Sequence, residues 1–266
     1  MLSGLIVYNK IDQEKNAWFI NQCKERFAKK GISLFYKEEN EVLDYIANNQ
    51  VDFVLYRARN YKIVESLESK GVKCFNNSLT NKVANNKYLT YQFLKEKNIP
   101  CLVSYTHFEE VNSLPVIMKS VDGHGGQEVF LVNSKKEAEQ TTNNLKKEMI
   151  YQEYYPNGDD LRLYVLDKKV IGAVKRHSGS DFRSNFSLGG DVEAFEPDAE
   201  LIKIAIEVAN SLDADYIGVD FIKVNDKWCI NEVEDPVGAR MLYKTTGLDV
   251  IDLLVDYIAN FLIVIN

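Results

Sequence analysis

The sequence has 266 residues, of which 45% are hydrophobic and 27% are charged, and its formal net charge at pH 7 is −7. This length allows one large domain or two to three small ones, with enough residues for a substantial core. The acidic balance argues against a nucleic-acid-binding surface as the main function.

The cysteines and the apolar segments indicate the compartment. Four cysteines, with no C-x-x-C pair among them, lie in apolar or mixed runs: Cys23, Cys74, Cys101 and Cys229. We therefore expect reduced, buried thiols and a cytoplasmic protein. The N-terminal stretch lacks the basic region and the cleavage site of a signal peptide. Two aspartates interrupt the apolar stretch 251–265, which predicts a buried amphipathic helix and no membrane contact.

Strands and helices alternate over the first 75 residues. Apolar runs predict strands at 4–8, 32–36, 52–57 and 72–75, and amphipathic patterns predict helices at 14–30, 41–48 and 61–70. This order implies a small parallel sheet with helices on its faces. Arg57 and Arg59 follow the third strand, at the edge where open α/β sheets bind ligands. Substrate contact and simple solubility are equally good interpretations of these two arginines.

A helical connection at 76–99 leads to a second group of strands. We expect strands at 102–107, 115–119 and 128–132 and a polar helix at 134–147. The loop SVDGHGGQ contains Gly123, Gly125 and Gly126 and follows Lys119. Such a loop lets backbone N–H groups approach an anion closely, although it lacks the GK[ST] signature of a Walker A motif. A flexible hairpin, with His124 exposed to solvent, is the alternative.

The last part of the chain is rich in strands. Patterns predict strands at 149–155, 160–166 and 169–177 with a turn at 168–169, a helix at 198–212, a hairpin of 216–223 and 227–233 around Asn225-Asp226, and a helix at 248–262. Arg162, Arg176 and Arg183 lie in or just after these strands. A cluster of guanidinium groups suits phosphate or carboxylate oxygens, whereas a single arginine more often forms a surface salt bridge.

Three carboxylates belong to the predicted hairpin. Glu232 and Glu234 point to the same face because side chains at i and i+2 of a strand do so, and the hairpin can bring Asp220 to that face. Three adjacent carboxylates repel one another unless a cation lies among them, and Mg²⁺ near phosphates uses one or two carboxylates. The alternative is an ordinary solvated acidic strand end.

Five stretches, in this order, resemble segments of the ATP-grasp ligases, and within them of the RimK-type carboxylate–amine ligases. They are NNSLTNKVANNKYLTYQFLKEKNIP with Lys87, PVIMKSVDGHGGQEVFLV with Lys119, YQEYYPNGDDLRLYVLDKKVIGAVKR, DFRSNFSLGG and GVDFIKVNDKWCINEVEDPVG. The resemblance implies an α/β and α+β architecture, the ATP-grasp fold. Its parts would be an N-terminal parallel α/β domain at 1–77 and two ATP-gripping subdomains at 78–148 and 149–266.

The resemblance also implies a role for each matching residue. The cofactors would be ATP and Mg²⁺, with Mn²⁺ as an alternative metal. ATP-binding residues would be Lys87, Lys119, Gly125, Gly126, Gln152, Glu153, Tyr154, Asp160 and Arg162, with the two lysines on the phosphates, the three consecutive residues at the adenine and Asp160 at the ribose. The metal ligands would be Asp220, Glu232 and Glu234, and the residues stabilising the transferred phosphate and the carboxylate substrate would be Arg176, Arg183 and Asn185.

The implied activity is amide-bond formation. ATP would phosphorylate a substrate carboxylate, and an amine would then displace phosphate from the acylphosphate. The partners would be amino acids, peptides or other small carboxylates and amines, with a protein or a biosynthetic intermediate as further options, and a homo-oligomer remains open. The family usually has an asparagine at the position of Glu234 and a small residue at that of Asp235. This departure keeps two alternatives in view: a nucleotide-binding regulatory or scaffold protein without turnover, and an ATP-grasp kinase.

Overall fold

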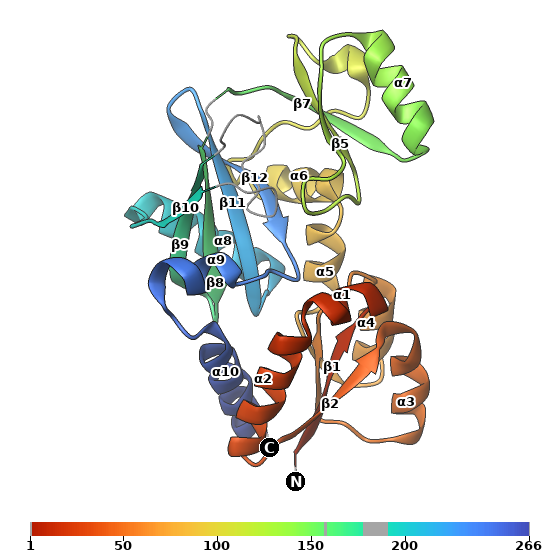
Figure 1. Cartoon of the computed structure of the whole chain (residues 1–266), viewed down its shortest axis with the longest axis vertical. Helices are drawn as coiled ribbons and strands as arrows, with labels where there is room; N and C mark the ends of the chain where they lie inside the picture. The colour runs from red at the N-terminus through yellow and green to blue at the C-terminus, as the bar shows by residue number, and fades with distance from the viewer. Residues whose placement is uncertain (1, 157–158, 178–190, 266) are drawn as a thin grey trace.

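The computed structural model describes residues 2–156, 159–177 and 191–265, and its strands form three sheets (Figure 1). The first sheet is parallel and has the strand order β2 (Ser33–Glu38), β1 (Ser3–Tyr8), β3 (Phe53–Tyr56) and β4 (Lys73–Phe75). The predicted parallel sheet is therefore present, built from the four apolar runs that indicated it.

The two-residue period of β1 divides its side chains between two cores. Ile6 and Tyr8 belong to the core that contains α2 (Ala17–Lys29) and α10 (Val250–Ile265). Leu5 and Val7 belong to the core formed with α3 (Val42–Asn48) and α4 (Tyr61–Glu68). Two short elements flank them, α1 (Lys10–Lys15) and the 3₁₀ turn η1 (Glu39–Glu41).

The end of the chain returns to its beginning. Figure 1 shows α10 beside α2, and the Arg26 guanidinium of α2 forms ion pairs of 2.6 Å with Asp249 and 2.5 Å with Asp252. The last helix therefore covers the N-terminal sheet, although the sequence assigns it to the C-terminal subdomain. This packing joins the first and last parts of the chain through one hydrophobic core.

Two helices, α5 (Ser78–Ala84) and α6 (Lys87–Glu96), lead to the second sheet. This antiparallel sheet has the order β6 (Val129–Val132), β5 (Val116–Ser120) and β7 (Met149–Glu153). Helix α7 (Lys135–Leu145) packs on it through Ala138, and the 3₁₀ turn η2 (Phe108–Glu110) lies at its border. Its core is small, which suits a part that grips a ligand against a larger neighbour.

The third sheet carries most of the candidate site. Its antiparallel order is β10 (Asp191–Ala194), β9 (Lys169–His177), β8 (Asp159–Leu166), β11 (Tyr216–Val224) and β12 (Lys227–Glu234). Leu163 of β8 and Val219 of β11 pack with α8 (Ala199–Leu212) on one face. The alternation of side chains then sends the polar residues of these strands to the opposite face. A further helix, α9 (Arg240–Thr246), follows β12.

The hairpin of β11 and β12 is the one that the sequence predicts. Asn225 and Asp226 both have positive φ, 48° and 64°, as a two-residue turn that matches the strand twist requires. Ser134 and Asp198, the first residues of two predicted helices, are the caps of α7 and α8, and each accepts a hydrogen bond from the first turn of its helix. The position of the β11–β12 turn was therefore predictable from the sequence.

Three local predictions were wrong or incomplete, and two elements were missed. The helix expected at 14–30 is two helices, because Asn16 ends α1 and its side chain binds the Asp12 carbonyl. The strand expected at 102–107 makes only isolated bridges, at Cys101 and Tyr105. The β8–β9 turn lies at 167–168, where both residues have positive φ, and neither β10 nor α9 was predicted.

The four cysteines are free, with Cys23 and Cys74 buried and Cys101 and Cys229 partly exposed. Burial raises the pKa of each thiol above its usual range, which keeps the group protonated and unreactive at neutral pH. In the part of the chain that the structure describes, no helix has both the length and the apolar character needed to cross a bilayer.

Candidate active site

Three carboxylates meet on the face of the third sheet that is opposite α8. The strand register pairs Asp220 with Glu232, and Glu234 lies two residues further along β12 on the same face. One oxygen of each carboxylate lies within 4.8 Å of one oxygen of each of the others. The structure therefore brings together the three residues expected to hold a metal. This set of hard oxygen donors fits Mg²⁺.

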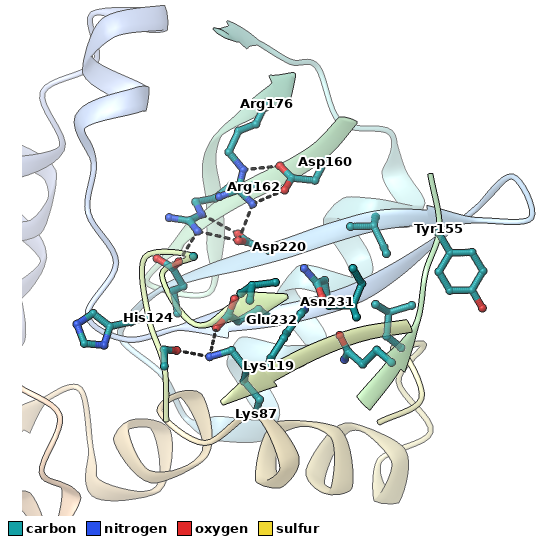
Figure 2. A pocket seen from close by; sticks show the side chains of 18 of the residues that line it. Lys87, Lys119, His124, Tyr155, Asp160, Arg162, Arg176, Asp220, Asn231 and Glu232 are labelled. Atoms are coloured by element: carbon teal, nitrogen blue, oxygen red, sulfur yellow. Dashed lines mark hydrogen bonds and ion pairs between the residues drawn. The ribbon is translucent and has the colours of Figure 1, made fainter. Parts of the chain in front are cut away.

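Two buried arginines neutralise this cluster (Figure 2). Arg162 lies opposite Asp220 across the β8–β11 pairing, and its Nε and Nη2 donate to the two Asp220 oxygens at 2.6 and 2.7 Å. Nη2 of Arg162 also lies 2.5 Å from Glu234, and Nη2 of Arg176 donates to Asp220 at 2.7 Å. Arg162 and Arg176 are only 6% and 4% exposed, so their ion pairs are buried and the interpretation as surface salt bridges is wrong for both.

Asp160 completes the network from β8. It lies opposite Arg176 in the β8–β9 register, and Nε and Nη2 of Arg176 donate to its two carboxylate oxygens. Burial raises the pKa of Asp220, but the charges and hydrogen bonds of Arg162 and Arg176 outweigh burial and hold that pKa at about 2. Burial and the neighbouring carboxylates outweigh Arg162 at Glu234 and raise its pKa.

Two lysines approach the cluster from the neighbouring subdomain. Lys87, the first residue of α6, lies 3.1 Å from Glu232 and donates a hydrogen bond to the Gly123 carbonyl. The Lys119 ammonium is buried and donates to Asn231 Oδ1 at 2.8 Å. Burial lowers the pKa of Lys119 to about 8, helped by the charge of Lys87 and opposed by Glu232.

Asn231 was missed by the sequence reasoning. The β11–β12 register shifts between Asp220 and Phe221, which pair with Glu232 and Ile230, so Asn231 is left without a partner across the ladder. This irregularity turns the amide toward Lys119. The available signal was a polar residue in an otherwise apolar part of the strand, but a bulge cannot be located from that signal alone.

The glycine-rich loop lies between the two lysines and the N-terminal domain. A Cβ at Gly123 would lie 2.1 Å from Ser120 Oγ and 2.8 Å from Glu128 Oε2, so any other residue would displace the hydrogen-bonded pair of Ser120 and Glu128. Gly125 and Gly126 have φ of 68° and 74°, in the left-handed region that favours glycine. The contact with Lys87 fixes the loop against α6, which argues against a freely flexible hairpin.

A cavity of about 140 Å³ runs from these charged groups to an apolar end. Gln152, Glu153 and Tyr154 line that end, together with the apolar side chains of Leu102, Ile117, Val129 and Ile222. Gln152 donates through Nε2 to Ser104 at 2.8 Å, while its buried Oε1 has no partner among the described residues. An unpaired acceptor beside apolar walls fits the amino group of a flat heterocycle such as adenine.

A second cavity of about 450 Å³ adjoins the first and reaches the N-terminal domain. Trp18, Phe19 and Tyr243 contribute aromatic surface, and Arg59, ion-paired with Asp12 at 2.6 Å, contributes charge. Residues that line both cavities include Lys87, Gly123, His124, Arg162, Arg176 and Glu232. The cavities therefore meet beside the charged cluster.

Arg57 and Asp235 connect the cluster to the N-terminal domain. Arg57 is 6% exposed and donates to the Val237 carbonyl at 2.7 Å, so the solubility interpretation of this residue is wrong. Asp235 is buried and accepts hydrogen bonds from the Asn76 and Asn81 amides at 2.8 and 2.9 Å. The aspartate at a position where a small residue was expected therefore anchors the chain directly after β12. Arg183 and Asn185, the remaining predicted site residues, lie outside the described residues.

Comparison with solved structures gives the fold. D-alanine–D-alanine ligase from Bacillus anthracis, solved in complex with ATP, matches with a TM-score of 0.77 at 18% identity over 100% of this chain and 98% of its own. A RimK domain protein of the ATP-grasp class from Sphaerobacter thermophilus matches with a TM-score of 0.71 at 18% identity over 96% of this chain and 98% of its own. The fold is thus the ATP-grasp fold, as the resemblance predicted.

The family follows from sequence. Residues 84–258 match the model of the RimK-like ATP-grasp domain. An uncharacterized protein of Mycoplasma genitalium is 31% identical over 91% of this chain and 86% of its own length. A probable alpha-L-glutamate ligase of Haemophilus influenzae is 27% identical over 85% of this chain and 82% of its own length. The chain belongs to the RimK-like ATP-grasp family, a family of ligases.

Proposed function

We propose that this protein is an ATP-dependent carboxylate–amine ligase. It forms an amide through an acylphosphate and releases ADP and phosphate. The observation that carries this proposal is the meeting of two cavities at one charged cluster. A ligase of this kind must hold a nucleotide and two further substrates around one transferred phosphoryl group, and a single nucleotide pocket would not provide that space.

The residues that line the first cavity suit the successive parts of ATP. Gln152, Glu153 and Tyr154 lie at its apolar end, where the adenine would bind, and Lys87 and Lys119 lie at its charged end with the loop of Gly125 and Gly126. Ammonium groups and backbone N–H groups from a glycine-rich loop are the usual phosphate ligands. Asp160 lines the same cavity, but its carboxylate is paired with Arg176. We therefore propose that its main role is to orient that arginine, and that contact with the ribose is secondary.

Asp220, Glu232 and Glu234 would hold Mg²⁺, or Mn²⁺ in its place. The bound metal would supply positive charge that neutralises the phosphates during transfer. In the structure these carboxylates are ion-paired with basic side chains: Glu232 with Lys87, and Asp220 and Glu234 with Arg162. Arg162 would therefore shift part of its hydrogen bonding toward the substrates when the metal binds. The extra charge of Glu234, relative to the usual asparagine, strengthens metal binding in this scheme.

The chemistry depends on position and charge. Arg162 and Arg176 line both cavities, so their guanidinium groups are suited to the transferred phosphoryl group and to the carboxylate that receives it. Arg183 and Asn185 would assist, as the family resemblance implies. Pre-positioned donors lower the barrier without a covalent nucleophile on the protein.

The names of the relatives suggest one amine to test first. Proteins of Haemophilus influenzae and Shewanella baltica that resemble this chain are named probable alpha-L-glutamate ligases, at 27% and 31% identity. We therefore propose L-glutamate as the first candidate amine. The carboxylate partner would be an amino acid, a peptide or a larger acceptor, and the size of the second cavity admits the first two directly.

The test is phosphate release from ATP and Mg²⁺ with a panel of carboxylates, each with and without L-glutamate and other amino acids. A ligase releases phosphate only with a particular pair and forms a product whose mass is the sum of the pair minus water. A kinase forms a product that carries a phosphoryl group and needs no amine. A regulatory protein without turnover binds ATP and releases no phosphate with any pair.

Three variants make the test specific to the site. Glu232→Gln removes a metal ligand and should abolish product, and Lys119→Ala should abolish ATP binding. Lys135→Ala removes an exposed lysine of the same subdomain, ion-paired with Glu109, and should change neither. Unchanged ATP binding by Lys119→Ala would show that the nucleotide site has been misplaced.

A further inference from the structure

The proposed reaction requires proton removal at a defined place. An amino group at neutral pH is mostly protonated and cannot attack an acylphosphate until it loses a proton. The base must therefore reach the second cavity, where the amine enters, close to its junction with the nucleotide cavity. His124 is the one histidine among the described residues that lines either cavity, and it lines both.

The local structure places His124 at this junction. It follows Gly123, whose carbonyl accepts the hydrogen bond of Lys87, and precedes Gly125, where the backbone has positive φ. Figure 2 shows the imidazole extending from the loop, away from Lys119. Two of the charged groups that act on its pKa, Arg59 and Asp12, belong to the N-terminal domain. The ring therefore stands between the phosphate-binding lysines and the second cavity.

The carboxylates of the second cavity already have partners. Each lies within ion-pair or hydrogen-bond distance of a donor: Asp12 with Arg59 at 2.6 Å, Asp122 with Lys147 at 3.3 Å, Glu232 with Lys87 at 3.1 Å, Glu234 with Arg162 at 2.5 Å, and Asp235 with Asn76 at 2.8 Å. Burial raises the pKa of Glu234 and Asp235, but Glu234 belongs to the predicted metal ligands and Asp235 anchors the chain after β12, so neither is free to serve as the base. Among the described residues no side-chain partner is found for the His124 ring.

The surroundings of His124 favour its neutral form. The pKa of the ring lies below its usual range because of partial burial and the positive charges of Arg59 and Lys87, while Asp12 and the Asp122 carbonyl act in the opposite direction. The Glu128 carboxylate, at the base of the loop, also interacts electrostatically with His124, and it is paired with Lys147 at 2.9 Å. Neutral imidazole is the form that accepts a proton, and the ring remains open to solvent, to which the proton can pass.

We propose that His124 is the general base that activates the amine substrate, a role that rests on the proposed ligase function. The imidazole takes one proton from the ammonium group, and the freed nitrogen lone pair attacks the acyl carbon. The carbon–oxygen bond to phosphate then breaks, and the second nitrogen proton passes to the departing phosphate. The products are the amide, hydrogen phosphate and one proton, which the imidazolium releases to water.

This role can be tested with two small nucleophiles, hydroxylamine and ammonia, that differ in how far they are protonated at neutral pH. Hydroxylamine is largely uncharged at neutral pH and traps acylphosphates as hydroxamates without a base, whereas ammonium must first be deprotonated. Wild type and the variants His124→Gln and His124→Asn are supplied with ATP, Mg²⁺ and the carboxylate panel at pH 7. Hydroxamate is then measured with hydroxylamine, and amide is measured by mass with ammonium or L-glutamate. His107→Gln, at a histidine that lines neither cavity, is the control.

In both His124 variants we expect hydroxamate formation within about twofold of wild type and amide formation lower by about 10²-fold. The amide rate of the variants should rise with pH toward the wild-type rate, because more of the amine is then deprotonated without help. Equal loss of hydroxamate and amide would indicate a structural role and overturn the proposal. So would unchanged amide formation, or a wild-type protein that forms hydroxamate but no amide. Absence of hydroxamate from wild type with every carboxylate would instead refute the ligase function itself.

Discussion

Asp220 supports a quantitative prediction about stability, because it stands at the centre of the buried charge network. The change Asp220→Asn keeps the shape of the side chain and removes its charge. The asparagine oxygen can still accept at one of the two carboxylate positions. The arginines therefore lose either the 2.6 Å bond from Arg162 Nε or the two 2.7 Å bonds from Arg162 and Arg176, and the bonds that remain go to a neutral acceptor. The amide nitrogen of asparagine also faces a guanidinium donor and has no acceptor there.

Removal of one partner from a buried ion pair typically costs about 3–5 kcal/mol, because the other charge stays buried. Arg162 keeps Glu234 and Arg176 keeps Asp160, so neither guanidinium is left alone. We therefore expect the free energy of unfolding to fall by about 3 kcal/mol, at the low end of this range. Urea unfolding monitored by tryptophan fluorescence, without nucleotide or metal, measures this difference from the shift in midpoint at constant slope.

The pH dependence follows from the low pKa of Asp220. The pKa in the folded state, about 2, is below the ordinary value of 3.8, so the unfolded state takes up the proton first as the pH falls. The contribution of Asp220 to stability is thus complete above about pH 4 and is lost as the pH falls toward 2. The difference between wild type and Asp220→Asn should shrink by roughly 2 kcal/mol over this interval.

Asp159→Asn is a matched control on the same strand. Asp159 is partly exposed and pairs with Lys175 at 2.9 Å, so its loss should cost less than about 1 kcal/mol. A destabilisation of Asp220→Asn no larger than that of the control would refute the view that the arginines depend on Asp220 for compensation.

Two further predictions concern Glu234 and Lys119. Glu234→Asn introduces the residue that is usual in the family, and it should raise the Mg²⁺ concentration needed for ADP binding by about tenfold. The free energy of unfolding should change by less than about 1 kcal/mol, because relief of the repulsion from Asp220 offsets the lost ion pair with Arg162. Unchanged Mg²⁺ dependence in calorimetric titrations would exclude Glu234 as a metal ligand. The pKa of Lys119 is lowered to about 8 from 10.5, so the unfolded state holds the proton to higher pH and wild-type stability should rise between about pH 8 and 10.5 relative to Lys119→Met. Parallel stability curves for these two proteins would show that the Lys119 ammonium is not destabilised by burial.

The sequence alone determined which residues share a strand face and where the β11–β12 hairpin turns. The two-residue period of a strand fixes that Glu232 and Glu234 point the same way, and the Asn225-Asp226 pair fixes the hairpin that brings Asp220 to them. These features are local, so the residues involved and their immediate neighbours specify them. The parallel sheet was likewise predictable, because each of its strands is an apolar run next to an amphipathic helix.

Only the tertiary structure decided what lies opposite each strand. Arg162 and Asp220 are 58 positions apart, and the strand period indicates the face of each but not the neighbour or the register. The same holds for Arg57, which local pattern leaves divided between solubility and binding until the chain after β12 covers it. The second cavity likewise combines residues from distant parts of the chain, such as Trp18, His124 and Tyr243. Such contacts depend on long-range packing, which periodicity and composition do not encode.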